Sequence, residues 1–239
     1  MLTDPCVGDS CRDSDVTIAF QTNGDSTRMS TLKNTAVLLI GMQNDHFGDD
    51  CMLRSAIENP ERIDMVKNRI LELIQTLSET DVTILNLPIL FREGHPEITQ
   101  QVGILATIKQ ASLFVEGTKG GRVIEELDSW SERVPTLSGR TGFNAFVDTS
   151  LNDFLTERGV QQLVLVGAST AVCIDSTART GYEMGYDILI LDDCTISRTL
   201  SEQDMYCDAI FPMYATVSST NDFLISNGLP ALAAPAETG

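Results

Sequence analysis

One cysteine lies where a buried strand is expected to turn into a helix. Segment 163–187 reads LVLVGASTAVCIDSTARTGYEMGYD, an apolar run followed by Gly167 and then by Cys173 at the start of a helical pattern. A thiol there meets the positive end of the helix dipole, which favours the thiolate. Unpaired backbone N–H groups at the helix start can also stabilise an oxyanion. The position indicates that Cys173 is a nucleophile. The alternative is that Cys173 is a small buried residue of the core, which is a common role of free cysteines.

The elements around this cysteine alternate between apolar strands and amphipathic helices. Asn59 and Pro60 are typical of a helix start, and six apolar residues that follow fall on one helical face. These are Ile63, Val66, Ile70, Leu73, Ile74 and Leu77. Strands are expected at 36–40, 82–88, about 133–135, 163–167, 187–192 and 214–218. Further helices are expected near 98–112, 119–127, 149–158, 172–184 and 201–210, and from Asn221 onward.

This order predicts an α/β fold, with three α/β/α layers and a mostly parallel central sheet. In such sheets chemistry lies at the carboxyl ends of the strands. That rule selects three segments, at 41–47, 87–96 and 167–173. We expect a polar N-terminal extension over 1–33, one catalytic domain over 34–229 and a disordered tail over 230–239.

Composition narrows the class of protein. The 239 residues carry a formal net charge of −18, which disfavours binding to nucleic acid because phosphates would be repelled. No apolar run approaches the roughly 20 residues of a membrane helix, and Asp4 and Asp9 do not fit an export signal. Six cysteines in a chain with this much core need no disulfides. We therefore expect a cytoplasmic protein with reduced thiols, bound neither to nucleic acid nor to a membrane.

The segment around Cys173 resembles the nucleophile motif of the isochorismatase-like cysteine hydrolases, a family that includes nicotinamidases. The family pattern G-x-x-T-x-x-C, followed by S-T-x-R and G-Y, is present in register. Its residues here are Gly167, Thr170, Cys173, Ser176, Thr177, Arg179, Gly185 and Tyr186. LLIGMQNDHF at 38–47 resembles the family's opening strand and D-M-Q-N-D-F turn, and 139–160 resembles the segment that carries its lysine. The resemblance covers roughly residues 34 to 228.

The resemblance implies an active site of aspartate, lysine and cysteine, in which the carboxylate carries the thiol proton. Carried over by position, the cysteine is Cys173, the lysine is replaced by Arg140 and the aspartate by Gly41. Arg140 keeps a permanent positive charge that can favour a thiolate or hold an anion. Gly41 removes a general acid/base, a contribution typically worth about 10²–10⁴-fold in rate.

Other residues enter the site through the same resemblance. It implies an oxyanion hole from the backbone N–H groups of Ser169 and Cys173, with a non-proline cis peptide between Ala168 and Ser169. Thr170, Gln43 and Asp45 are candidate substrate-binding residues. Asp45 is also a candidate substitute for the missing acid.

The sequence also contains further acidic residues near the site and one candidate metal-binding segment. Asp148 and Asp175 fit surface or helix-capping positions better than catalytic ones. Glu93 and His95 fall near a metal-binding segment of the nicotinamidase branch, but three or more protein ligands are wanted. We expect neither a metal nor a cofactor, and His95 as a loop residue that shapes the pocket.

Three functions remain open. The first is a hydrolase of a small amide or ureide C–N bond, acting through a thioester on Cys173. The second is a catalytically inactive relative that binds a small ligand or a partner protein. The third is a thiol redox sensor that uses Cys173, with Cys194 as its partner. Cleavage of a vinyl ether, as in isochorismatases, fits the sequence badly. That reaction needs the family's aspartate, which this sequence lacks, and does not need the cysteine, which it keeps.

The resemblance implies a homo-oligomer, either a dimer or a tetramer.

Overall fold

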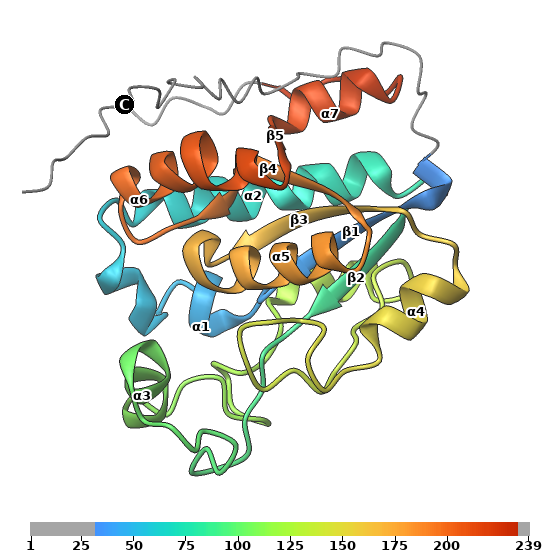
Figure 1. Cartoon of the computed structure of the whole chain (residues 1–239). Helices are drawn as coiled ribbons and strands as arrows, with labels where there is room; N and C mark the ends of the chain where they lie inside the picture. The colour runs from blue at the N-terminus through green and yellow to red at the C-terminus, as the bar shows by residue number, and fades with distance from the viewer. Residues whose placement is uncertain (1–31, 234–239) are drawn as a thin grey trace, which may run out of the picture.

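A parallel five-stranded sheet forms the centre of the protein, in the order β2-β1-β3-β4-β5. The computed structural model describes residues 32–233, apart from the side chains of Met52 and Leu53 (Figure 1). All four strand pairs are parallel. The strands are β1 (Thr35–Ile40), β2 (Thr83–Leu87), β3 (Gln162–Ala168), β4 (Asp187–Ile196) and β5 (Thr216–Ser218).

Helices connect the strands and cover both faces of the sheet (Figure 1). The α-helices are α1 (Asn44–Phe47), α2 (Glu61–Leu77), α3 (Gly103–Gln110), α4 (Leu151–Glu157), α5 (Asp175–Glu183), α6 (Leu200–Met205) and α7 (Thr220–Ser226). The 3-10 turns are Leu32–Asn34, Met52–Ala56, Glu125–Trp130 and Phe211–Met213, and the π turns are Thr170–Ile174 and Tyr206–Ile210.

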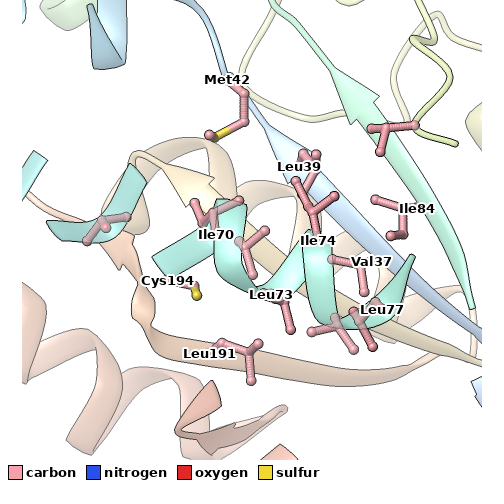
Figure 2. Close-up of a cluster of buried hydrophobic side chains, with 14 of the residues drawn as sticks. Val37, Leu39, Met42, Ile70, Leu73, Ile74, Leu77, Ile84, Leu191 and Cys194 are labelled. Atoms are coloured by element: carbon pink, nitrogen blue, oxygen red, sulfur yellow. The ribbon is translucent and has the colours of Figure 1, made fainter. Parts of the chain in front are cut away.

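Alternate strand residues enter two separate hydrophobic clusters. In β1, Val37 and Leu39 join the cluster under α2 and α7, whereas Leu38 and Ile40 join the cluster under α4 and α5. Figure 2 shows the α2 side, where Ile70, Leu73, Ile74 and Leu77 face Val37, Leu39 and Ile84. This is the period-2 alternation of a sheet covered on both faces. The predicted three-layer α/β/α fold is confirmed, as is the predicted buried face of α2.

Two predicted elements differ from the structure. The segment expected to be helical at 119–127 instead forms turns, followed by the 3-10 turn Glu125–Trp130. Segment 133–135 adds no strand to the described sheet and leads only to an isolated parallel bridge between Asn86 and Thr136. Two glycines, Gly120 and Gly121, lie in the first segment, and Pro135 cannot donate a ladder hydrogen bond in the second.

The direction of strand order changes between β1 and β3. From β1 the chain moves to β2 on one side, and it later returns to add β3 and then β4 on the other side. Ile40 and Gly167 are paired at the carboxyl ends of these two strands. Such a topological switch point is where open parallel sheets bind ligands. Two of the three predicted segments, 41–47 and 167–173, meet there.

Both ends of the chain extend beyond the residues that the structure describes. Of the predicted extension over 1–33, residues 1–31 lie outside the described residues. Of the predicted disordered tail over 230–239, residues 234–239 lie outside them as well. Within 230–233, Leu232 exchanges hydrogen bonds with Asn221, and the Ala233 carbonyl accepts one from Arg69 at 3.0 Å. The described part of this segment therefore lies against α2 and α7.

Candidate active site

Cys173 lies in a widened turn between β3 and α5. The Ala168–Ser169 peptide bond is cis, as predicted. The N–H of Ile174 donates to the Ser169 carbonyl five residues back, at 3.1 Å, so the helix begins as a π turn. The sequence predicted an ordinary α-helix from about 172, whereas α5 begins at Asp175. Single π turns of this kind are often found at functional sites.

Thr170 anchors this turn to the neighbouring helix. Its hydroxyl donates to Oε1 of Gln203 at 2.8 Å, and Gln203 Nε2 donates to the Thr195 hydroxyl at 3.0 Å. Thr170 and Thr195 are fully buried. Thr170 was predicted to bind substrate, and this geometry favours a positioning role for its side chain.

Arg140 lies beside Cys173 and is almost completely buried, with 1% of its surface exposed. Burial lowers the pKa of this guanidinium below its usual value, and the charge of the neighbouring Cys173 opposes that shift. Its Nη1 donates to the Phe143 carbonyl at 3.2 Å, while Nε and Nη2 have no hydrogen-bond partner among the described residues. A buried cation needs a compensating negative charge. A Cys173 thiolate or an anionic substrate would supply it.

Gly41 follows β1 with a φ of +70°, and the imidazole of His46 occupies the space beside it. A Cβ atom at position 41 would lie 2.8 Å from both Cε1 and Nδ1 of His46 and 3.2 Å from the Ala168 carbonyl oxygen. Nδ1 of His46 also lies 2.8 Å from the Gly41 carbonyl oxygen. The predicted position of the missing aspartate is therefore filled by a different titratable side chain.

Asp45 and Gln43 turn away from this cluster. The Asp45 carboxylate accepts the N–H of Phe114, and burial raises the pKa of this carboxyl. Gln43 is fully buried and uses its amide on the backbone, donating to the Ile89 and Gly121 carbonyls and accepting the Ile89 N–H. These contacts favour loop-positioning roles. They give no support to Asp45 as a substitute base.

A large pocket is lined in part by Asp45 and does not include the Cys173 cluster. Its volume is about 860 Å³, and its lining includes Asp45, Lys67, Lys119 and Arg122 but neither Cys173 nor Arg140.

Asp175 forms an ion pair with Arg179 and accepts a hydrogen bond from the Tyr214 hydroxyl at 2.7 Å, so it has the structural role expected of it.

His95 contributes to loop structure. Its Nε2 lies 2.7 Å from the Leu113 carbonyl oxygen, and the side chain is buried. Within residues 32–233 no group of three or more His, Cys, Asp or Glu side chains is arranged to hold a metal ion.

Cys194 cannot pair with Cys173 in this fold. Cys194 belongs to the cluster on the α2 side of the sheet, where Figure 2 shows it, and Cys173 belongs to the cluster on the α5 side. The four described cysteines are all free thiols. The redox hypothesis loses its expected partner cysteine because the sheet separates the two thiols.

The fold and this cluster define an α/β protein with a cysteine-centred site at the switch point of a parallel sheet. The model of the isochorismatase domain matches residues 35–222. The chain therefore belongs to the isochorismatase family.

Three relatives illustrate the likeness. The isochorismatase family protein YddQ of Bacillus subtilis is 27% identical over 200 residues, covering 80% of this chain and 98% of YddQ. Nicotinamidase 3 of Arabidopsis thaliana is 26% identical over 164 residues, covering 68% of this chain and 73% of that protein. The crystal structure of a cysteine hydrolase from Pseudomonas syringae has a TM-score of 0.68 at 20% identity, covering 82% of this chain and 93% of that one.

Sequence reasoning missed His46. The signal was available in LLIGMQNDHF, which departs twice from the motif D-M-Q-N-D-F. Glycine replaces the aspartate at 41, and histidine stands at 46 where the motif has phenylalanine. Considered separately, glycine at position 41 indicates the loss of an acid, and histidine at position 46 indicates a surface substitution. The structure shows that the two changes share one space.

No helix among the described residues is long and apolar enough to cross a membrane. The cytoplasmic location and the dimeric or tetrameric assembly stay predictions.

Proposed function

We propose that the protein is a cysteine-dependent hydrolase of a small amide or ureide C–N bond. The observation that carries this proposal is the position of Cys173, at the switch point and beside the buried guanidinium of Arg140. Arg140 favours the thiolate, which is the nucleophilic form of cysteine. Family membership and the likeness to a nicotinamidase support an amide-type substrate.

The reaction has two stages. Cys173 Sγ attacks the carbonyl carbon, a C–S bond forms and the carbonyl oxygen takes the negative charge. The C–N bond then breaks, and the nitrogen leaves with a proton as ammonia or an amine. Water attacks the thioester, the C–S bond breaks, and the acid and the free thiol are released. Backbone N–H groups at Ser169 and Cys173 are the proposed oxyanion donors.

A direct test measures ammonia release from nicotinamide, acetamide and N-carbamoylglycine. Cys173→Ser should abolish turnover of whichever probe the wild type accepts, and a covalent adduct should map to Cys173 by peptide mass spectrometry. Cys207→Ser is a matched control, because this thiol is also buried and accepts from Gln203 at 3.4 Å. Undiminished turnover by Cys173→Ser would sink the proposal.

The inactive-relative alternative rested on the absence of an acid at position 41. An imidazole in that space weakens the argument, since imidazole also accepts protons. No described feature favours the binding role specifically.

A further inference from the structure

The His46 ring is held in one tautomer and one orientation. A carbonyl oxygen only accepts hydrogen bonds, so the 2.8 Å contact with Gly41 O assigns the proton of neutral His46 to Nδ1. The ring centroid lies 4.6 Å from that of Phe114 and 6.2 Å from that of Phe47. Cys51 Sγ donates to the His46 carbonyl at 3.3 Å, which fixes the backbone as well. Nε2 is left as an acceptor, and no hydrogen bond engages it within residues 32–233.

The same ring lies within the electrostatic reach of Arg140, the neighbour of the thiol. Arg140 acts on both groups: its charge lowers the pKa of His46, and it interacts directly with Cys173. Gly41 and Ala168 bring the two turns together, because Ala168 O would lie 3.2 Å from a Cβ at position 41. Asp45 and His95 are both hydrogen-bonded to loop backbone. Of these two residues and His46, only His46 has an unengaged acceptor on a ring that packs against Gly41.

We infer that His46 is the proton carrier of the site. Neutral Nε2 takes the proton of the Cys173 thiol as Sγ attacks the carbonyl carbon, and it returns that proton to the nitrogen as the C–N bond breaks. In the second stage Nε2 takes a proton from water as the C–O bond forms, and the thiolate leaves. The proton then passes from Nε2 to Sγ, so the enzyme ends the cycle as it began. This role rests on the proposed function.

The basicity of His46 fits the role. Burial lowers its pKa to about 4; the Gly41 hydrogen bond opposes this shift, and the charge of Arg140 adds a still smaller lowering effect. An ordinary aspartate has a pKa of about 3.9. At neutral pH the imidazole is therefore uncharged and able to accept a proton.

The inference can be tested with p-nitrophenyl acetate on the full-length protein. The wild type should release a burst of p-nitrophenol, acetylate Cys173 and then deacetylate. His46→Gln keeps an N–H for the Gly41 carbonyl but cannot carry a proton. It should slow deacetylation about 10²–10⁴-fold, so that acetyl-Cys173 accumulates. At alkaline pH, where a thiol ionises without a base, its acetylation burst should survive. A merely structural role would reduce both steps together.

A paired variant provides a second arm. Gly41→Asp alone should not restore the acid, because its Cβ would meet the imidazole. Gly41→Asp combined with His46→Ala frees that space, and aspartate tolerates positive φ better than most residues. The pair should deacetylate at least about tenfold faster than His46→Ala.

The outcomes separate the two proposals. Deacetylation by His46→Gln at the wild-type rate would overturn the role of His46 and leave Cys173 as nucleophile. A wild type that is never acetylated at Cys173 would overturn the proposed function, and the role of His46 with it.

Discussion

Arg140 lies against Cys173 with two of its three guanidinium nitrogens unpaired among the described residues. This relationship gives the thiol a permanent cation in a site from which solvent is nearly excluded. Burial of such a group costs free energy unless a negative charge compensates it. The arrangement is therefore expected to favour function at the expense of stability.

Replacing Arg140 should separate these two effects. Arg140→Met removes the charge, and alkylation of Cys173 at neutral pH should slow by about 10- to 100-fold. Stability should stay the same or rise, because the unpaired donors are removed. Arg140→Lys keeps a charge and should retain most of the reactivity. Alkylation kinetics and thermal unfolding would show both effects, and a faster thiol in Arg140→Met would contradict them.

His46 should make stability depend on pH. In the unfolded chain an imidazole has a pKa of about 6.5, whereas in the fold that of His46 is lowered to about 4. Between these values the unfolded state binds more protons, so stability falls as the pH decreases from 6.5 to 4. His46→Phe lacks this contribution. When the pH is lowered from 7 to 4.5, the wild type should therefore lose about 2 kcal/mol more of its free energy of unfolding than His46→Phe does.

Urea unfolding at the two pH values would measure this difference. Charged or titratable groups around His46 include Arg140 across the site, Asp45 in the chain and the Cys51 thiol at its carbonyl. The sequence contains only two histidines, so the subtraction isolates one imidazole. Parallel pH curves for the two proteins would show that His46 titrates as a free histidine.

Gly167 should be intolerant of any side chain. Its φ is +116°, and a Cβ there would overlap the Ile40 carbonyl oxygen of the neighbouring strand. Gly167→Ala is expected to lose about 3 kcal/mol or more. Gly159→Ala is the matched control, because its φ of +63° is also left-handed but its Cβ would meet nothing within 4 Å. That control should lose only about 1 kcal/mol, and equal losses in chemical denaturation would refute the close approach.

The described thiols should differ sharply in reactivity. Burial raises the pKa of Cys51 and Cys194, and burial with nearby carboxylates raises that of Cys207 to about 12. At pH 7 these three should resist iodoacetamide, so that Cys173 dominates the labelling of residues 32–233. Cys6 and Cys11 lie outside the described residues, and replacing both with serine removes their signal. Peptide mass spectrometry would assign each adduct, and preferential labelling of Cys207 would contradict this order.

The sequence alone was sufficient to predict the main helices and strands of the fold. The apolar spacing from Ile63 to Leu77 predicted the buried face of α2, and apolar runs predicted β1 and β3 to within a residue or two. Such patterns work because burial repeats along a helix or strand. They do not describe the segment between β2 and α4, where turns and one short helix replace regular elements.

The site was only partly predictable for the same reason. The positions of Cys173 and Arg140 followed from strand ends and from the family resemblance. The place of the His46 ring depends on the φ of Gly41 and on contact with Phe114, a residue distant in sequence. Neither effect produces a periodic pattern in the amino-acid sequence. The 860 Å³ pocket beside Asp45 likewise follows from packing between loops.

The most direct test of the central claim is the rate of Cys173 alkylation by iodoacetamide as a function of pH. If Arg140 and the turn after β3 favour the thiolate, Cys173 should already react rapidly at pH 7, whereas a free cysteine is mostly the unreactive thiol below about pH 8.5. A Cys173 that reacts slowly, or only above that pH, would contradict its role as the nucleophile.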